Sequence, residues 1–136
     1  MAAIVVTAAE VLPTATTTKQ TVIFGGTITA GMWLYLDTTD NTYKAADADA
    51  LASAKVAGMA LCSGGDGQYG VIATGGAVDP GGTVAVGEPY FLHTDAGGFG
   101  VRGELTSGDF ATYLGYATTA AVFNIQIQIA TVALAA

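Results

Sequence analysis

The stretch Gly25-Gly26-Thr27-Ile28-Thr29-Ala30-Gly31 recurs as Gly81-Gly82-Thr83-Val84-Ala85-Val86-Gly87, at an offset of 81 − 25 = 56 residues. Glycine supplies the positive φ angles that tight turns need, and β-branched residues fit the surface of a pleated sheet. Each copy therefore predicts a Gly-Gly turn, a short Thr-Ile or Thr-Val strand, and a second bend at the last glycine.

The similarity between the two copies continues beyond these stretches. Leu34-Tyr35-Leu36 matches Tyr90-Phe91-Leu92 at the same offset, and Tyr43 matches Phe99. Further on, Ala57-Gly58-Met59-Ala60 matches Leu114-Gly115-Tyr116-Ala117 at an offset of 115 − 58 = 57, which requires one inserted residue. Similarity at a nearly fixed offset indicates an internal repeat. We therefore predict a tandem duplication, with pseudo-repeats over about residues 25–80 and 81–132.

The pattern within each copy is typical of β-structure. An aromatic-rich strand is followed by turn-forming residues and then by Tyr43 or Phe99, which would begin the returning strand of a hairpin. Residues 123–129, Phe-Asn-Ile-Gln-Ile-Gln-Ile, alternate strictly between apolar and polar, as a half-buried strand does. A chain of 136 residues usually forms one domain. We expect an all-β fold, a β-barrel or β-sandwich over residues 21–136, preceded by an extended N-terminal arm over residues 1–20.

Three segments lack a clear strand pattern. Residues 45–55 contain several alanines and two aspartates, so we expect at most a short helix there. Their counterpart, residues 102–110, contains two glycines and predicts a loop. The polar run 14–20 is expected to be extended or flexible.

The composition excludes several classes of function. Four Lys and Arg residues stand against 11 Asp and Glu residues, giving a net charge of −7, so a basic surface for nucleic acid or an anionic membrane is absent from the sequence. No apolar run reaches the roughly 18 to 20 residues that a membrane helix needs. The N-terminus lacks the basic region of a secretory signal, so we expect synthesis in the cytoplasm. Only 11% of residues are charged, and such a surface tends to be covered by a partner.

Residue types that catalyse reactions in other proteins do not form a recognisable catalytic set in this sequence. His93 is the only histidine and aligns with Asp37 of the first copy, which indicates a scaffold position rather than a general base. Cys62 is the only cysteine, which excludes an intrachain disulfide and favours a small buried apolar residue. Glu10, Glu88 and Glu104 offer no pair of carboxylates placed across a cleft.

Two further groups resemble binding sites only in part. The oxygen-bearing residues Asp37, Asp40, Asn41, Asp47 and Asp49 lack the loop spacing of an EF-hand, and turn caps explain them more simply. Residues 64–70 have the glycine content of a phosphate-binding loop but no Lys-Ser/Thr partner, and they predict a hairpin turn. We expect no catalytic residue, no metal and no cofactor.

The aromatic residues allow two interpretations. They form either a platform that stacks against sugars or, as their positions in the repeats favour, a core or a subunit interface. The residues concerned are Trp33, Tyr35, Tyr43, Tyr69, Tyr90, Phe91 and Tyr113.

The apolar start of the chain is the candidate partner-binding segment. An extended apolar arm adds a strand to the sheet edge of a partner or lies in a partner's groove. The equally weighted alternative is an edge strand of the chain's own domain. The candidate contact residues are Ala2, Ala3, Ile4, Val5, Val6, Val11 and Leu12.

The motifs Gly-Gly-Thr-Ile-Thr-Ala-Gly (25–31), Leu-Tyr-Leu-Asp (34–37), Val-Ala-Gly-Met-Ala-Leu (56–61) and Gly-Gln-Tyr-Gly (67–70) resemble small capsid decoration, or cement, proteins of tailed double-stranded DNA bacteriophages. The resemblance covers roughly residues 20–132. It implies a β-rich subunit, commonly a homotrimer, that binds the outer surface of the major capsid protein shell and stabilises it on the virion. Similar elements occur in phage head fibres and tail proteins, which leaves a module that binds host surface glycans as the alternative.

Overall fold

A computed structural model describes residues 4, 6, 11–82, 84–94, 97–130 and 133–134. The first half of the chain contains β1 (Val11–Pro13), β2 (Thr18–Ile23), β3 (Trp33–Asp37), β4 (Thr42–Ala45), β5 (Val56–Ala60) and β6 (Tyr69–Pro80). The second half contains β7 (Pro89–Leu92), β8 (Phe99–Gly100), a 3-10 turn (Arg102–Glu104), β9 (Tyr113–Ala117) and β10 (Phe123–Gln128). The prediction of an all-β fold is confirmed.

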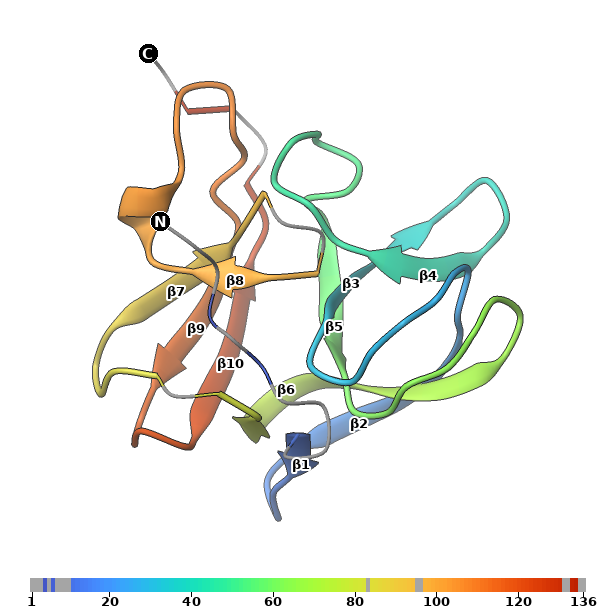
Figure 1. Ribbon diagram of the computed structural model, residues 1–136, viewed down its shortest axis with the longest axis horizontal. Coiled ribbons are helices and arrows are strands. Elements are labelled where there is room, and N and C mark those ends of the chain that lie inside the picture. The colour runs from blue at the N-terminus through green and yellow to red at the C-terminus, as the bar shows by residue number, and fades with distance from the viewer. Residues whose placement is uncertain are drawn as a thin grey trace.

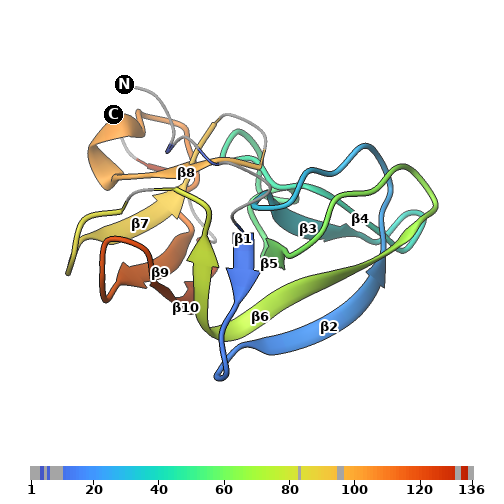
Figure 2. The same ribbon diagram turned by 60° about the horizontal axis from the view of Figure 1, so that its bottom comes forward.

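The strands form a sheet whose order is symmetric about its centre. The order is β4-β3-β5-β6-β10-β9-β7-β8, with β1 and β2 also paired to β6 (Figure 1). Read from its two ends, the sheet runs β4-β3-β5-β6 in the first copy and β8-β7-β9-β10 in the second. The antiparallel sheet curls into an open half-barrel with the two copies side by side (Figure 2).

Residue pairing reproduces the sequence offset. Leu36 pairs with Tyr43 in the first copy, and Leu92 pairs with Phe99 in the second. Leu34 pairs with Gly58, and the register then shifts by a bulge before the next residue of β3. The equivalent pair in the second copy, Tyr90 with Gly115, is followed by the same shift. The two hairpins predicted from the sequence are therefore present and share their irregularities.

The last glycine of each repeated motif makes the predicted bend. Gly31 and Gly87 have φ angles of 95° and 77°, a region that side-chain-bearing residues rarely adopt. Their N–H groups donate to the carbonyl oxygens of Ala60 and Ala117, each at 2.8 Å. The short Thr-Ile and Thr-Val strands expected before these bends are reduced to isolated bridges, Ile28 with Gly64 and Val86 with Ala117. Turns on either side leave too few residues for a ladder.

Strand β6 of the first copy also pairs with the second copy. Its first half pairs with β2, from Ile23 opposite Tyr69 to Thr18 opposite Gly75. Its second half pairs with β1 and β10, and Figure 2 shows β6 running beneath β3 and β5 and ending beside β10. At the changeover, Gly76 has φ 77°, and a Cβ at this position would overlap the carbonyl oxygen of Thr16.

The polar run 14–20, expected to be extended or flexible, consists of a turn followed by the extended start of β2. The Thr17 N–H donates to the Thr14 carbonyl at 3.3 Å, and β2 begins at Thr18. The hydroxyl of Thr14 donates to the carbonyl of Ala77 at 2.8 Å, and that of Thr17 donates to the same oxygen. Together with β1, this turn places residues 11–20 of the expected arm within the sheet.

The short helix allowed for residues 45–55 is absent, because the backbone of this segment bonds elsewhere. The N–H groups of the buried Ala46 and Ala48 donate to the carbonyls of Trp33 and His93, at 2.7 and 3.2 Å. One turn remains, closed by the Ala54 N–H on the Ala50 carbonyl at 3.0 Å. In the second copy, where a loop was expected, residues 102–104 form the 3-10 turn.

The core divides into a large cluster and a small one. In the large cluster, aromatic rings from both copies meet with centroid distances of 5.6–6.0 Å, most of them edge to face. These rings belong to Trp33, Tyr90, Phe99 and Phe123. The small cluster belongs to the first copy and its β2 strand, and consists of Val22, Phe24, Ile28, Leu34, Ala60 and Ile72.

Candidate partner-binding site

The described part of the N-terminal segment lies against the chain's own second copy. The Ile4 N–H donates to the carbonyl oxygen of Phe99 in β8 at 2.8 Å. The side chains of Ile4 and Val6 are half-buried and pack against the large core cluster. Of the two interpretations of the apolar start, the structure shows these residues on their own domain.

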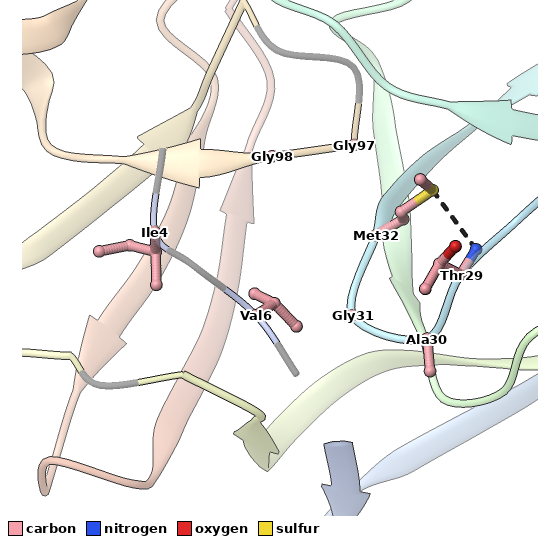
Figure 3. A pocket seen from close by; sticks show the side chains of 8 residues that line it. All are labelled: Ile4, Val6, Thr29, Ala30, Gly31, Met32, Gly97 and Gly98. Atoms are coloured by element: carbon pink, nitrogen blue, oxygen red, sulfur yellow. Dashed lines mark hydrogen bonds between the residues drawn. The ribbon is translucent and has the colours of Figure 1, made fainter. Parts of the chain in front are cut away.

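Ile4 and Val6 line a cavity of about 230 Å³. Figure 3 shows the side chain of Val6 directed toward the bend at Gly31 and that of Ile4 directed away from it, with Gly97 and Gly98 also lining the cavity. We call the surface that receives them the arm site. It consists of the carbonyl of Phe99 together with Thr29, Ala30, Gly31, Met32, Gly97 and Gly98.

Gly31 gives the arm site its shape. A Cβ on this residue would lie 2.5 Å from Val6 Cγ1 and 3.2 Å from Val11 Cγ2, so Val6 approaches the bare backbone of the bend. Such close approach is a known use of glycine. A bend at Gly31 was predicted from the sequence, but its contact with the arm was not. Its place at the end of the repeated motif was the only signal, and Gly87 carries the same signal without such a contact.

The other residues that were expected to bind a partner differ in their exposure. Val11 is 5% exposed and pairs with Pro80, whereas Leu12 is 56% exposed and pairs with Asp79. Ile4, Val6 and Val11 thus face the body of the molecule, and Leu12 faces outward. Ala2, Ala3 and Val5 lie outside the described residues.

The carbonyl that receives Ile4 has an exact counterpart at the 56-residue offset. In the first copy, the Tyr43 carbonyl accepts the N–H of Gly25 at 2.8 Å, which joins β4 to the end of β2. The residue equivalent to Gly25 is Gly81, whose N–H instead donates to Asp79 Oδ1 at 3.0 Å. Ile4 therefore takes, in the second copy, the place that a residue of the same copy takes in the first.

His93 and Cys62 form hydrogen bonds with neighbouring loops and strands. His93 is 6% exposed, and its backbone bonds to Gly98 and Ala48. Cys62 is half-buried rather than buried, and its Sγ accepts the Val71 N–H at 3.4 Å. Glu88 is half-buried, and Glu10 lies outside the described residues. Among the described residues, no group of three His, Cys, Asp or Glu side chains is placed to hold a metal ion.

The acidic residues at the end of β3 and in the loop that follows it contact this loop and one lysine. Asp37 Oδ1 accepts hydrogen bonds from the N–H and hydroxyl of Thr39, at 3.0 and 2.7 Å, while its Oδ2 lies 2.6 Å from Lys44 Nζ. The lysine holds the pKa of Asp37 well below its ordinary value, and the Asp37 carboxylate raises the pKa of Lys44. The Thr42 hydroxyl is the main cause that lowers the pKa of Asp40.

Asp47 and Asp49 lie in the next loop. Asp47 Oδ1 accepts the Asp49 N–H at 2.8 Å, a local turn contact. Burial raises the pKa of Asp47, and the nearby carboxylates of Asp49 and Asp109 add to this effect. These aspartates therefore act within their turns.

The glycine-rich loop and the aromatic residues have structural positions. Residues 61–68 connect β5 to β6, which pair antiparallel, as the predicted hairpin turn requires. Trp33 and Tyr90 are 0% and 3% exposed, and the half-buried Phe91 and Tyr113 pack edge to face at 5.6 Å. Only Tyr69, at 75%, is strongly exposed among the seven platform candidates. The rings do not form a continuous exposed platform.

Among the described residues, no helix has the length and apolar character needed to cross a membrane. In comparisons with protein-family models, with curated proteins and with solved structures, the chain has no match.

Proposed function

We propose that the chain is a structural subunit of a bacteriophage virion, a decoration protein that binds the outer surface of the major capsid protein shell and stabilises it. The observation that carries the proposal is a surface poor in charge with large exposed apolar side chains on both copies. These side chains are Leu12, Leu36, Leu51, Tyr69, Val86 and Ile129. Depletion of charge is the compositional signal of the buried centre of protein interfaces.

The resemblance of the repeated motifs to capsid decoration proteins supports the same proposal. The motif residues form bends and hairpins of the fold. His93 is buried, and the aspartates of the first copy form hydrogen bonds within their turns. A subunit of this kind acts through its surfaces. We propose a homotrimer, in which each pairwise contact of ordinary size buries roughly 800 Å² per partner. The net charge of −7 would orient the subunit relative to basic patches on the shell more than it would add affinity.

The experiment is co-sedimentation with expanded, DNA-free capsids of tailed phages. The full chain is expected to sediment with a capsid that it decorates and to raise the temperature at which that capsid disrupts. A chain that lacks residues 2–12 is expected to lose binding. Retained binding by the truncated chain, or failure of the full chain to bind any shell, would contradict the proposal.

Truncation also removes the contacts of Val11 and Ile4 with the body, so a point variant is needed. Leu12→Asp changes a side chain that is 56% exposed, and we expect a loss of shell binding of tenfold or more with an unchanged unfolding midpoint. Thr16→Asp, on the exposed turn that follows β1, is the matched control and should bind as the wild type does. Equal binding of the two variants to the shell would show that Leu12 does not contact the shell.

The alternative function is a head-fibre or tail module that binds host surface glycans. One observation favours it, the 75% exposure of Tyr69, because an exposed ring can stack against a sugar. Burial of Trp33 and Tyr90 removes the largest rings from such a site. A glycan array with no bound sugar would exclude this alternative, and binding abolished by Tyr69→Ala would support it.

A further inference from the structure

We infer that the cavity beside the bend at Gly31 binds a small, uncharged aromatic molecule with a single ring or a fused pair. The cavity remains while Ile4 and Val6 lie against the body, and its volume is about 230 Å³ (Figure 3). In another protein, a dry apolar cavity of about 150 Å³ holds benzene. The cavity beside Gly31 is therefore large enough for such a ligand. Such a site goes beyond the proposed function and does not depend on binding to a shell.

Among the described residues, no charged side chain lines this cavity. Only Ile4, Val6, Thr29 and Met32 contribute side chains larger than a methyl group, and none of them is ionisable. The remaining lining residues are alanine and glycine. Transfer of a charged ligand from water into such a site would cost free energy that no partner in the lining offsets. The lining therefore selects an uncharged ligand.

The backbone donors around the cavity already have partners within the protein. The N–H groups of Gly31 and Gly97 donate to carbonyl oxygens of the body at 2.8 and 2.7 Å, and that of Ala30 donates to a serine hydroxyl at 3.0 Å. The Met32 N–H donates within the bend, to the Thr29 carbonyl at 3.1 Å. Since these donors are not available to a polar ligand, apolar contact must supply the binding energy.

Two features of the cavity favour a flat ring over a branched aliphatic molecule. Gly31, Gly97 and Gly98 present bare backbone, which a planar ligand can approach closely. Met32 presents a thioether, and its sulfur makes favourable contacts with aromatic rings. A ring therefore fits the cavity better than an aliphatic molecule of equal volume, and the exposed Thr29 in the lining leaves it a path from solvent.

A bound ring would contact the arm and the body together. Val6 reaches the cavity from the arm, whereas Met32 and Gly97 belong to the body. A ligand that binds the folded chain and not the unfolded one stabilises the fold by mass action. Binding should therefore raise the temperature at which the chain unfolds, and it should hold the arm more firmly against the bend.

The test measures binding of the uncharged rings toluene and indole to the full chain by calorimetry, with benzoate as the charged counterpart. We expect toluene and indole to bind with dissociation constants of about 1 mM or below and to raise the unfolding temperature. Benzoate should bind more weakly by about tenfold or more. Failure of both uncharged rings to bind, or binding of benzoate as tight as that of toluene, would overturn the inference.

Two matched variants locate the ligand. Thr29→Phe places a ring in the lining of the cavity and should weaken the binding of indole by about tenfold or more. Thr27→Phe adds the same ring at an exposed threonine that is not among the lining residues, and it should bind indole as the wild type does. NMR of the wild type gives a measurement independent of both variants, since nuclear Overhauser effects should connect bound indole to the Met32 methyl group. Equal affinities of the two variants, or contacts of bound indole that leave out Met32, would place the ligand elsewhere and contradict the inference.

Discussion

The two copies have equivalent strand pairing and differ in which residue bonds to the strand at the sheet edge. In the first copy, β4 is joined to the end of β2 through Gly25, and a small cluster of its own fills the interior. In the second, the residue equivalent to Tyr43 is Phe99, which lies in the aromatic core shared by both copies, and Ile4 completes the edge. Duplication reproduces the strand pairing and the bends. Single residues at equivalent positions then decide whether the edge strand of a copy bonds to a residue of that copy or to one outside it.

The largest expected effect comes from exchanging the paired aromatic residues for alanine. Phe99 is fully buried and contacts Trp33, Tyr90 and Phe123, so Phe99→Ala should lower the free energy of unfolding by about 3–5 kcal/mol. Tyr43→Ala removes a half-buried ring and should cost about 1 kcal/mol. Urea unfolding followed by the fluorescence of Trp33 measures both. Equal losses would mean that the two copies contribute equally to the core.

A smaller effect is expected at the paired bulges. A Cβ at Gly58 would overlap the carbonyl of Ala73, and one at Gly115 would overlap that of Asn124. Overpacking of this kind costs about 1–3 kcal/mol. Gly115 also has φ 149°, whereas Gly58 has no positive φ, so Gly115→Ala should be the more destabilising variant. If urea midpoints place Gly58→Ala lower, backbone conformation is not what separates the copies here.

The smallest effects concern carboxylates in loops of the first copy. Asp37, whose pKa is lowered chiefly by Lys44, contributes stability that is present above about pH 4 and is lost as the pH falls through its folded-state pKa. Asp37→Asn should therefore lower the urea midpoint at pH 7 and have less effect at pH 3.

Asp47 has the opposite sign, since burial raises its pKa. Its contribution is most favourable below about pH 4 and is lost as the pH rises through the folded-state pKa. Asp47→Asn keeps an oxygen for the Asp49 N–H and should raise stability at pH 7 by at most about 0.5 kcal/mol, with no gain at pH 3. Urea midpoints of the two variants at both pH values test the signs.

The hairpins and bends were predictable because they depend on local chemistry. The offset placed Tyr43 and Phe99 at the starts of returning strands, and alternation identified the strand that begins at Phe123. Burial along that strand fades from Phe123, which is fully buried, to Ile129, which is 45% exposed, although the isoleucines repeat regularly. Alternation of apolar and polar residues predicts which face of a strand is buried, but not the residue at which burial ends.

The long strand and the arm site could not be predicted. β6 contains Gly70, Gly75, Gly76 and a terminal proline, residues that usually interrupt strands, and only its Val71-Ile72 pair suggested one. Close approach of Phe24 to Gly64 and Gly70 and of Thr16 to Gly76 explains three of the glycines in and beside this strand. The contact between Ile4 and Phe99 joins positions 95 residues apart, and no local pattern encodes it.

Because β6 of the first copy pairs with β10 of the second, the duplicated halves cannot be separated without breaking this strand pairing. Loss of the second half would remove β10 from the end of β6 and would expose the shared aromatic core. We therefore expect a single cooperative unfolding transition, in which tension applied at either end of the chain is resisted by both halves at once. In the capsid role proposed above, the subunit would unfold only as a whole, and one repeat would not detach from the other.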